Sequence, residues 1–148
     1  MVVVSVQGEI KRVQEVVANP SALGLLGLAM VTLVASSQKL GITGGDTHSV
    51  ALVLPWAIFL GAIAQLVAGL YDFKHNNTFG ATAFCGYGLF WCGVAMTWMI
   101  NMGMFGANAA AAADINQLGF AFLGYFIFTL YMTVGAMSTH KVLFTIFV

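Results

Sequence analysis

The polar side chains inside the apolar stretches of this sequence are amides and hydroxyls rather than acids or bases. They include the glutamine Gln65, threonines such as Thr32 and tyrosines such as Tyr87. These groups donate and accept hydrogen bonds without carrying a charge. An amide is costly in an apolar environment unless it is paired, so Gln65 should face either neighbouring helices or a pore.

Residues that could bind a metal or catalyse a reaction are few and widely separated. His48, His75 and His140 lie between the apolar stretches and lack the spacing of metal ligands. Cys85 and Cys92 are seven positions apart, about 10 Å along a helix, which is too far for a disulfide. The sequence shows no arrangement of a nucleophile and a general base that would indicate catalysis. The sequence therefore predicts no enzyme, no metal site and no cofactor.

The composition identifies the environment in which these polar groups must work. The chain has 148 residues with five acidic and five basic side chains, 60% hydrophobic residues and a mean hydropathy of +0.94. A soluble domain carries about 25% charged residues, whereas this chain carries 7%. The net charge is zero and no basic stripe is present, which argues against nucleic acid as a partner. These features indicate an integral membrane protein whose surroundings are a lipid bilayer.

The charges divide the chain into apolar stretches that are each longer than the ~20 residues a helix needs to cross a bilayer. These stretches are apolar on all sides, whereas strands of a membrane barrel alternate apolar and polar residues. The sequence therefore predicts an all-α membrane protein. The predicted spans are residues 21–37, 50–71, 80–100 and 118–137.

The two ends of the chain carry weaker patterns. Residues 1–18 are predicted to be an N-terminal interfacial segment. In residues 6–18, apolar side chains recur at helical spacing at Val6, Ile10, Val13 and Val17, which predicts a short amphipathic helix at the membrane interface. A frayed terminus is the alternative. Residues 19–148 then form the transmembrane domain. The apolar run from 142 to Val148 is too short to cross a bilayer, so we expect a fifth span that this chain holds only in part.

The basic residues predict the orientation of the spans. With four spans, Lys11, Arg12, Lys74 and Lys141 lie on one side of the membrane and Lys39 lies on the other. Basic residues concentrate on the cytoplasmic side. We therefore expect a multi-pass protein of the cell membrane, plasma or inner, with a cytoplasmic N-terminus.

Two spans begin with strong helix-start signals. Asn19 and Pro20 suit the cap and the first helical position, and Asn77 and Thr78 start the third span in the same way. In the predicted topology both starts lie at one cytoplasmic mouth. Helix N-termini attract anions, so the hypothesis of an anion-attracting mouth stands beside the simpler interpretation as ordinary caps.

Small residues recur within the first two spans and in the fourth, where they are Gly119 and Gly124. Gly24 and Gly27 share one side of the first span. A stripe at spacing four follows on the second span, at Ala57, Gly61, Gln65 and Gly69. Small residues let helix backbones approach closely in lipid, so these stripes predict helix packing and do not identify a substrate.

Three separated segments carry a family resemblance. They are NPSALGLLGLAMVTLV at residues 19–34, GAIAQLVAGLYDFKHNNTFGATAFCGYGLFW at 61–91 and LGYFIFTLYM at 123–132. Together they resemble the acetate uptake transporters, also called succinate–acetate permeases, over roughly residues 18–148.

The resemblance implies a six-span helical bundle with both termini in the cytoplasm and a hexamer with one pathway in each protomer. It also implies passage of acetate and other small monocarboxylates, in some members succinate, through a channel or with protons. The family's narrow point combines an aromatic residue on span one, a tyrosine on span three and a leucine on span five. Tyr87 matches the tyrosine, and Leu28 stands where many members have phenylalanine. The span-five residue would follow Val148.

The candidate pathway residues suit such a solute. Leu28, Phe84 and Tyr87 could line the path of a methyl group, and Gln65 and Thr32 could donate hydrogen bonds to a carboxylate. A fixed cation would hold the anion too tightly for release. Two other functions are consistent with uncharged spans. One is a channel for small neutral solutes such as ammonia or water, and the other is a structural subunit of a membrane complex.

Overall fold

Among the residues that the computed structural model describes, four helices are long and apolar enough to cross a membrane. The structure describes residues 2–6, 9–13, 18–43, 50–139 and 144–146. The first span is α1 (Ser21–Lys39), the third is α4 (Thr78–Asn101) and the fourth is α6 (Ile115–Met137). The second span is continuous through α2 (Leu54–Trp56), η1 (Ala57–Ala64) and α3 (Gln65–Lys74). The four predicted spans and the helical fold class are confirmed.

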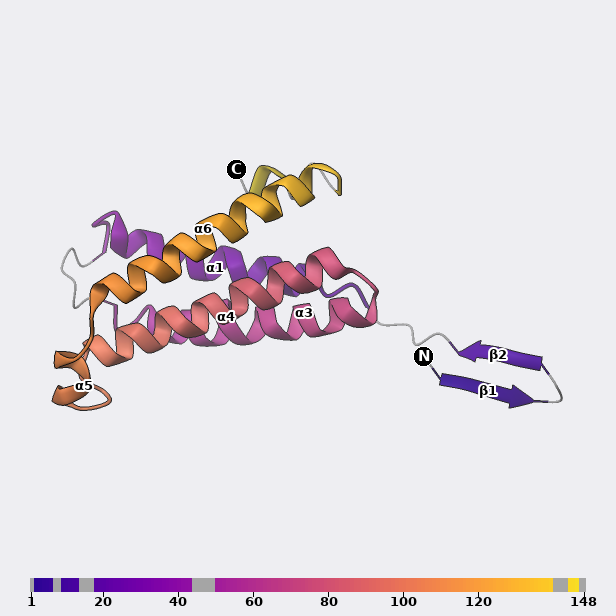
Figure 1. The fold of residues 1–148 in the computed structure, drawn as a ribbon, viewed down its shortest axis with the longest axis horizontal. Helices are drawn as coiled ribbons and strands as arrows, with labels where there is room; N and C mark the ends of the chain where they lie inside the picture. Colours follow the sequence, from indigo (N-terminus) through magenta and orange to yellow (C-terminus); the bar gives the residue numbers. More distant parts are fainter. Residues whose placement is uncertain (1, 7–8, 14–17, 44–49, 140–143, 147–148) are drawn as a thin grey trace.

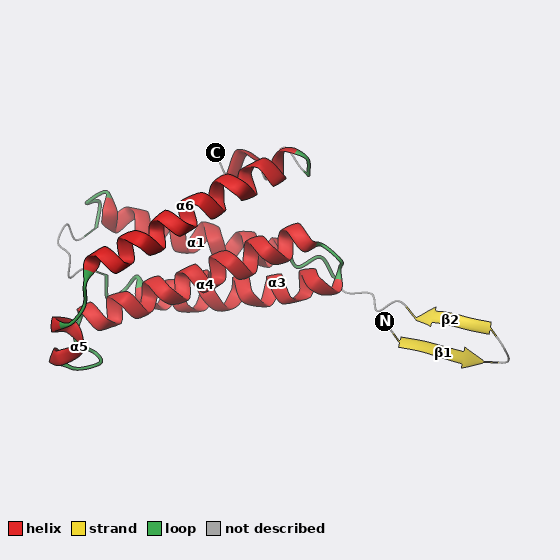
Figure 2. Ribbon diagram, viewed as in Figure 1, coloured by secondary structure: helices red, strands yellow, loops and turns green. Residues whose placement is uncertain are grey.

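The first three spans pack against one another, and the fourth lies to one side. Helix α1 contacts η1 and α3, and α4 contacts both of these, whereas α6 contacts chiefly α4 and runs obliquely to it (Figure 1). The short helix α5 (Ala107–Ala111) lies in the connection between α4 and α6 (Figure 2). The hydrophobic core lies between the first three spans and comprises Val31, Leu54, Ala57, Ala62, Trp91, Val94 and Ala95.

Glycines bring the backbones of the first two spans close together. A Cβ atom at Gly27 would collide with the carbonyl oxygen of Leu60 and would lie 3.3 Å from Cγ of Gln65. At Gly61, a Cβ would lie 2.8 Å from Cγ of Trp91. All four residues of the stripe on the second span are buried, as are Gly24 and Gly27. The predicted packing role is confirmed for the small residues of the first two spans, whereas nothing among the described residues lies within 4 Å of the Cβ positions of Gly119 and Gly124 on α6.

The middle of the second span is a π-helix rather than an α-helix. It covers the eight residues of η1 and follows Pro55, which lies in the first turn of α2. Such wider turns are rare and occur frequently at functional sites. Gln65 is the first residue after this stretch, so the change of helical pitch occurs directly before the buried amide.

The expected amphipathic helix over residues 6–18 is wrong where the structure describes this segment. Strands β1 (Val2–Val6) and β2 (Glu9–Val13) pair in antiparallel register, with Val2 opposite Val13 and Val6 opposite Glu9. Consecutive β-branched residues favour a strand over a helix, and this preference outweighs the helical spacing. Residues 7–8 and 14–17 lie outside the described residues.

The predicted fifth span falls only partly within the structure. Residues 144–146 are helical, whereas 140–143 and 147–148 lie outside the described residues. His48, His140 and Lys141 also fall outside them. The start of that span at residue 142 therefore stays a prediction.

Replacing Gly27 by alanine should loosen the contact between α1 and the second span. The new methyl group meets a backbone carbonyl, which cannot move aside as a flexible side chain can, and overpacking of this kind costs about 1–3 kcal/mol. We expect Gly27→Ala to lower the midpoint of thermal unfolding in detergent. Gly93→Ala is the matched control, because nothing lies within 4 Å of its Cβ position and alanine favours the helix by about 1 kcal/mol. Equal midpoints for the two variants would contradict the packing role.

Candidate functional site

A cavity of about 340 Å³ lies at the end of the bundle where α1 and α4 begin. We call it the mouth cavity. Its lining comes from the start of α1, the start of α4, Gln65 on α3 and residues that follow α6. The lining residues are Asn19, Ser21, Leu25, Leu28, Gln65, Asn77, Phe79, Gly80, Ala83, Phe84, Tyr87, Thr139 and Ile146.

Most of the residues singled out from the sequence meet in this cavity. Leu28, Gln65, Phe84 and Tyr87 line it, and so do the two helix-start asparagines, Asn19 and Asn77. Residues far apart in the chain are thus brought to one place by the packing of α1 and α3 against α4. What these residues do there is not decided by their position alone.

Three other candidates do not reach the cavity lining. Thr32 is exposed, and its hydroxyl donates to the carbonyl oxygen of Leu28 at 2.7 Å within its own helix. A threonine in a helix readily bonds the preceding turn in this way. The hydroxyl of Thr32 is therefore bonded within α1 and does not reach the cavity. Pro20 and Thr78 adjoin the mouth, but neither lines the cavity.

Gln65 is the most unusual polar group of the cavity. Its side chain is 0% exposed, and neither its amide oxygen nor its amide nitrogen has a hydrogen-bond partner among the described residues. Buried polar groups are nearly always paired, so an exception calls for an explanation. Its position on the cavity wall supplies one, because a solute or water in the cavity could accept from the nitrogen and donate to the oxygen.

An asparagine side chain accepts a backbone hydrogen bond at each helix start of the mouth, and at α4 this bond is the N-cap. Oδ1 of Asn77 accepts from the amide of Gly80 at 3.0 Å, which confirms the predicted cap of α4. Oδ1 of Asn19 accepts from the amide of Ser21 at 2.9 Å. The helix α1 itself begins at Ser21 with Pro20 at the N-cap, one position later than expected. The carbonyl oxygen of Ala18 lies 3.1 Å from Nε2 of His75, which links the segment before α1 to the end of α3.

Asp72 is a buried acid that directly follows the predicted second span, residues 50–71. The helix α3 continues to Lys74, so Asp72 lies inside the second membrane helix and is only 1% exposed. Its Oδ2 has no hydrogen-bond partner among the described residues and lies against Gly80 of the mouth cavity. The signal was present, because Gln65, Gly69 and Asp72 follow the i, i+4, i+7 spacing of one helix face.

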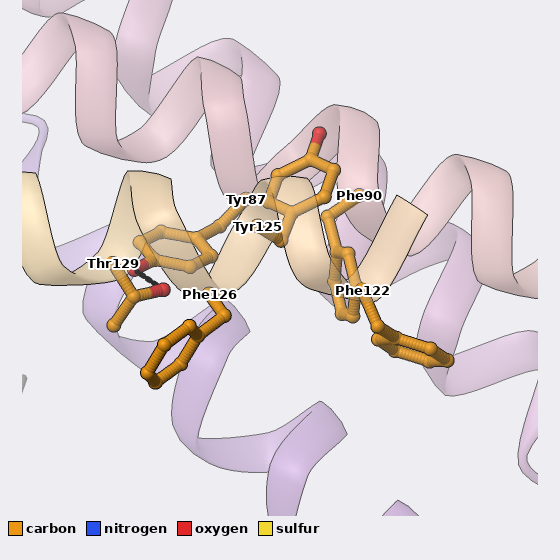
Figure 3. Close-up of a pocket in the computed structure, with 6 residues that line it drawn as sticks. All are labelled: Tyr87, Phe90, Phe122, Tyr125, Phe126 and Thr129. Carbon is orange, nitrogen blue, oxygen red and sulfur yellow. Dashed lines mark hydrogen bonds between the residues drawn. The ribbon is translucent and has the colours of Figure 1, made fainter. Parts of the chain in front are cut away.

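A second cavity, of about 210 Å³, lies between α4 and α6. We call it the side cavity. Five aromatic rings and one threonine line it, and Tyr87 is shared with the mouth cavity (Figure 3). The remaining lining residues are Phe90, Phe122, Tyr125, Phe126 and Thr129. The hydroxyl of Tyr87 lies 2.9 Å from Oγ1 of Thr129, so this pair is hydrogen-bonded across the two helices.

A match to a protein family covers nearly the whole chain. The GPR1/FUN34/yaaH family model matches residues 5–148. The chain belongs to this family. Its four long apolar helices and this membership identify a multi-pass membrane protein, and the resemblance to the acetate uptake transporters is confirmed.

Individual relatives agree with the family match. The succinate-acetate/proton symporter SatP of Escherichia coli is 38% identical over 132 residues, which are 88% of this chain and 65% of the relative. The ammonia transport outward protein 2 of Saccharomyces cerevisiae is 35% identical over 131 residues, which are 88% of this chain and 46% of the relative. This chain thus spans about half to two thirds of the length of these relatives.

A solved structure extends the likeness to the fold. The structure of the bacterial acetate channel SatP aligns with a TM-score of 0.74 at 34% sequence identity. The alignment covers 88% of this chain and 68% of the solved chain. The four membrane helices described above are therefore arranged as in a family member with a channel structure.

Proposed function

We propose that the protein carries acetate and related small monocarboxylates, succinate among the candidates, across a membrane. The single observation that carries this proposal is the unpaired amide of Gln65 in a cavity that Leu25, Leu28 and Phe84 also line. The names of the relatives support it, because they describe a succinate-acetate symporter and an acetate channel. The proposed activity is transport without a chemical reaction, and it requires no cofactor.

The lining of the mouth cavity suits both ends of acetate. The amide nitrogen of Gln65 can donate to the carboxylate, and Leu28 and Phe84 offer an apolar surface to the methyl group. A hydrogen bond to a charged group contributes about 1.5–3 kcal/mol. That is enough to favour entry, yet a neutral donor does not trap the anion as a fixed cation would.

The helix starts extend this proposal to the entrance. We propose that Asn19 and Asn77, with the adjoining Pro20 and Thr78, form a cytoplasmic mouth at which carboxylates enter or leave. Asn19 and Asn77 both line the cavity, and the exposed amide groups of a helix N-terminus favour negative charge.

Replacing Gln65 by leucine should reduce acetate uptake into proteoliposomes. Leucine keeps the approximate volume but removes the donor, so we expect initial rates of radiolabelled acetate uptake to fall about tenfold or more. Gln117→Leu is the matched control, since Gln117 is exposed at the start of α6 and outside both cavities. Uptake by the unmodified protein no faster than in empty liposomes would refute the proposal.

Competition separates this function from passage of neutral solutes. The ammonia transport relative and the uncharged cavity lining favour a channel for ammonia as the second candidate. Under the main proposal, excess propionate slows acetate uptake and excess urea does not, because only propionate shares the carboxylate. Acetate uptake that responds to neither compound, together with rapid ammonia flux, would favour the second candidate.

We also propose that the protein assembles as a homo-oligomer, with a hexamer expected from the family resemblance. Large apolar side chains such as Phe120, Leu123 and Ile127 of α6 are exposed within one chain and can be covered by lipid or by a second copy. Light scattering of the detergent-purified protein should give the mass of six chains. A monomer would contradict the assembly, and purification only with a different membrane protein would favour a structural subunit.

The proposed orientation places the mouth cavity on the cytoplasmic side of the cell membrane. Thr78 is exposed at the start of α4, and Ala112 is exposed beyond the other end of that helix. With Cys85 and Cys92 replaced by alanine, we expect Ala112→Cys to react with a membrane-impermeant maleimide on intact cells. Thr78→Cys should react only after permeabilisation. Labelling of Thr78→Cys in intact cells would reverse the orientation.

A further inference from the structure

Tyr87 is the residue that the two cavities share. Its side chain lines the mouth cavity together with Gln65 and also lines the side cavity between α4 and α6. A change in the position of this side chain would therefore alter both cavities. What holds Tyr87 in place then bears directly on the proposed pathway.

The polar end of Tyr87 is bonded to α6 rather than directed at a solute. Its hydroxyl lies 2.9 Å from Oγ1 of Thr129, as the dashed line in Figure 3 shows. Its ring meets the ring of Phe128 edge to face, with centroids 5.4 Å apart and an interplanar angle of 64°. Both partners lie on α6, so this helix orients the tyrosine.

Two further contacts between α4 and α6 lie at the turn of α4 that carries Tyr87, and another joins Phe79 of α4 to Gly135 of α6. The hydroxyl of Tyr125 donates to the carbonyl oxygen of Gly86 at 3.1 Å. A Cβ at Gly86 would lie 2.7 Å from the ring of Phe128, so only glycine leaves room for that ring. Elsewhere α6 is mostly exposed, and its buried residues are Met132 and Ala136. The position of α6 relative to α4 therefore determines the contacts made by Gly86 and Tyr87.

We propose that Thr129 is a positioning residue that sets how strongly Tyr87 binds a passing carboxylate. This inference rests on the proposed transport function. While the hydroxyl of Tyr87 is bonded to Thr129, a carboxylate gains that hydroxyl only by displacing the threonine. One hydrogen bond is then exchanged for another, and such an exchange has a small net free energy. The solute is held weakly at this point and leaves readily.

Removing the threonine hydroxyl should convert this weak binding into tighter binding. Valine has nearly the same shape as threonine and cannot hydrogen-bond, so Thr129→Val removes the hydrogen bond between the Tyr87 hydroxyl and residue 129. A carboxylate that bonds the half-buried Tyr87 hydroxyl then no longer has to displace the threonine, which strengthens its binding. We expect the KM for acetate uptake to fall about threefold to tenfold and the maximal rate to fall as well, because release slows.

Two control variants separate the hydroxyl from general damage to the helix. Thr129→Ser keeps the hydroxyl and should retain the KM of the unmodified protein. Thr97→Val makes the same chemical change in α4, where the hydroxyl bonds the carbonyl oxygen of Gly93 in its own helix. It lies outside both cavities and should leave the KM unchanged.

A double-mutant cycle with Tyr87→Phe tests whether the effect passes through Tyr87. In that background no tyrosine hydroxyl is present, so adding Thr129→Val should produce no further fall in KM. Equal KM values for Thr129→Val and the unmodified protein would overturn the inference. So would the same fall in KM in the Tyr87→Phe background, because the threonine would then act by another route.

A failure of the proposed function would look different. In that case the unmodified protein would take up no acetate, and all variants would equal empty liposomes. The same four proteins can then be compared by thermal unfolding in detergent. A coupling between the two substitutions in the unfolding midpoint supports the Tyr87–Thr129 bond, and its absence overturns the inference.

Discussion

The close approach of α1 to the second and third spans is the contact on which the mouth cavity depends. Gly27 lies against the backbone of Leu60 and against Gln65, and Gly24 leaves the space that the ring of Phe84 occupies. Two glycines one helical turn apart thus leave room for the side chains of Gln65 and Phe84, which line the cavity. Close packing of this kind is the main source of helix association in lipid, where the hydrophobic effect between helices is absent.

The same packing explains why an unpaired amide persists inside an apolar bundle. Gln65 follows the π-helical stretch and lies where α1, α3 and α4 converge, so its side chain cannot swing out to the surface. Water or a solute in the cavity could form hydrogen bonds with this amide and leave again. Tyr87 presents the opposite arrangement, because its hydroxyl already has a protein partner in Thr129. Under the proposed function, the amide of Gln65 is therefore available to a solute. The hydroxyl of Tyr87 binds a solute only when the solute displaces Thr129.

Much of the fold was predictable because membrane spans depend on local composition. The spans, the buried stripe of small residues and the cap at Asn77 follow from apolar length, helical spacing and side-chain chemistry. The convergence of Leu28, Gln65, Phe84 and Tyr87 was predicted with the help of the family resemblance.

The features that the sequence reasoning missed depend on choices that composition does not resolve. The N-terminal hairpin arises because β-branched residues outweigh a helical spacing that the same residues also satisfy. Thr32 bonds its own helix, and the bond between Tyr87 and Thr129 requires knowing where α6 crosses α4. Asp72 was misplaced because a charge was taken to end a span, although its spacing from Gln65 continues the buried face.

Asp72 also changes how the entrance must be understood. Its carboxyl group lies against Gly80 in the first turn of α4, where a helix presents a partial positive charge. When ionised, that acid offsets the attraction of α4 for other anions, whereas no acidic residue lies in the first turn of α1. The two helix starts are therefore unequal, and under the proposed function a carboxylate that enters the mouth cavity would favour the side of α1. Leu28 of α1 and Gln65 of α3 line the cavity and could then contact its methyl group and its carboxylate.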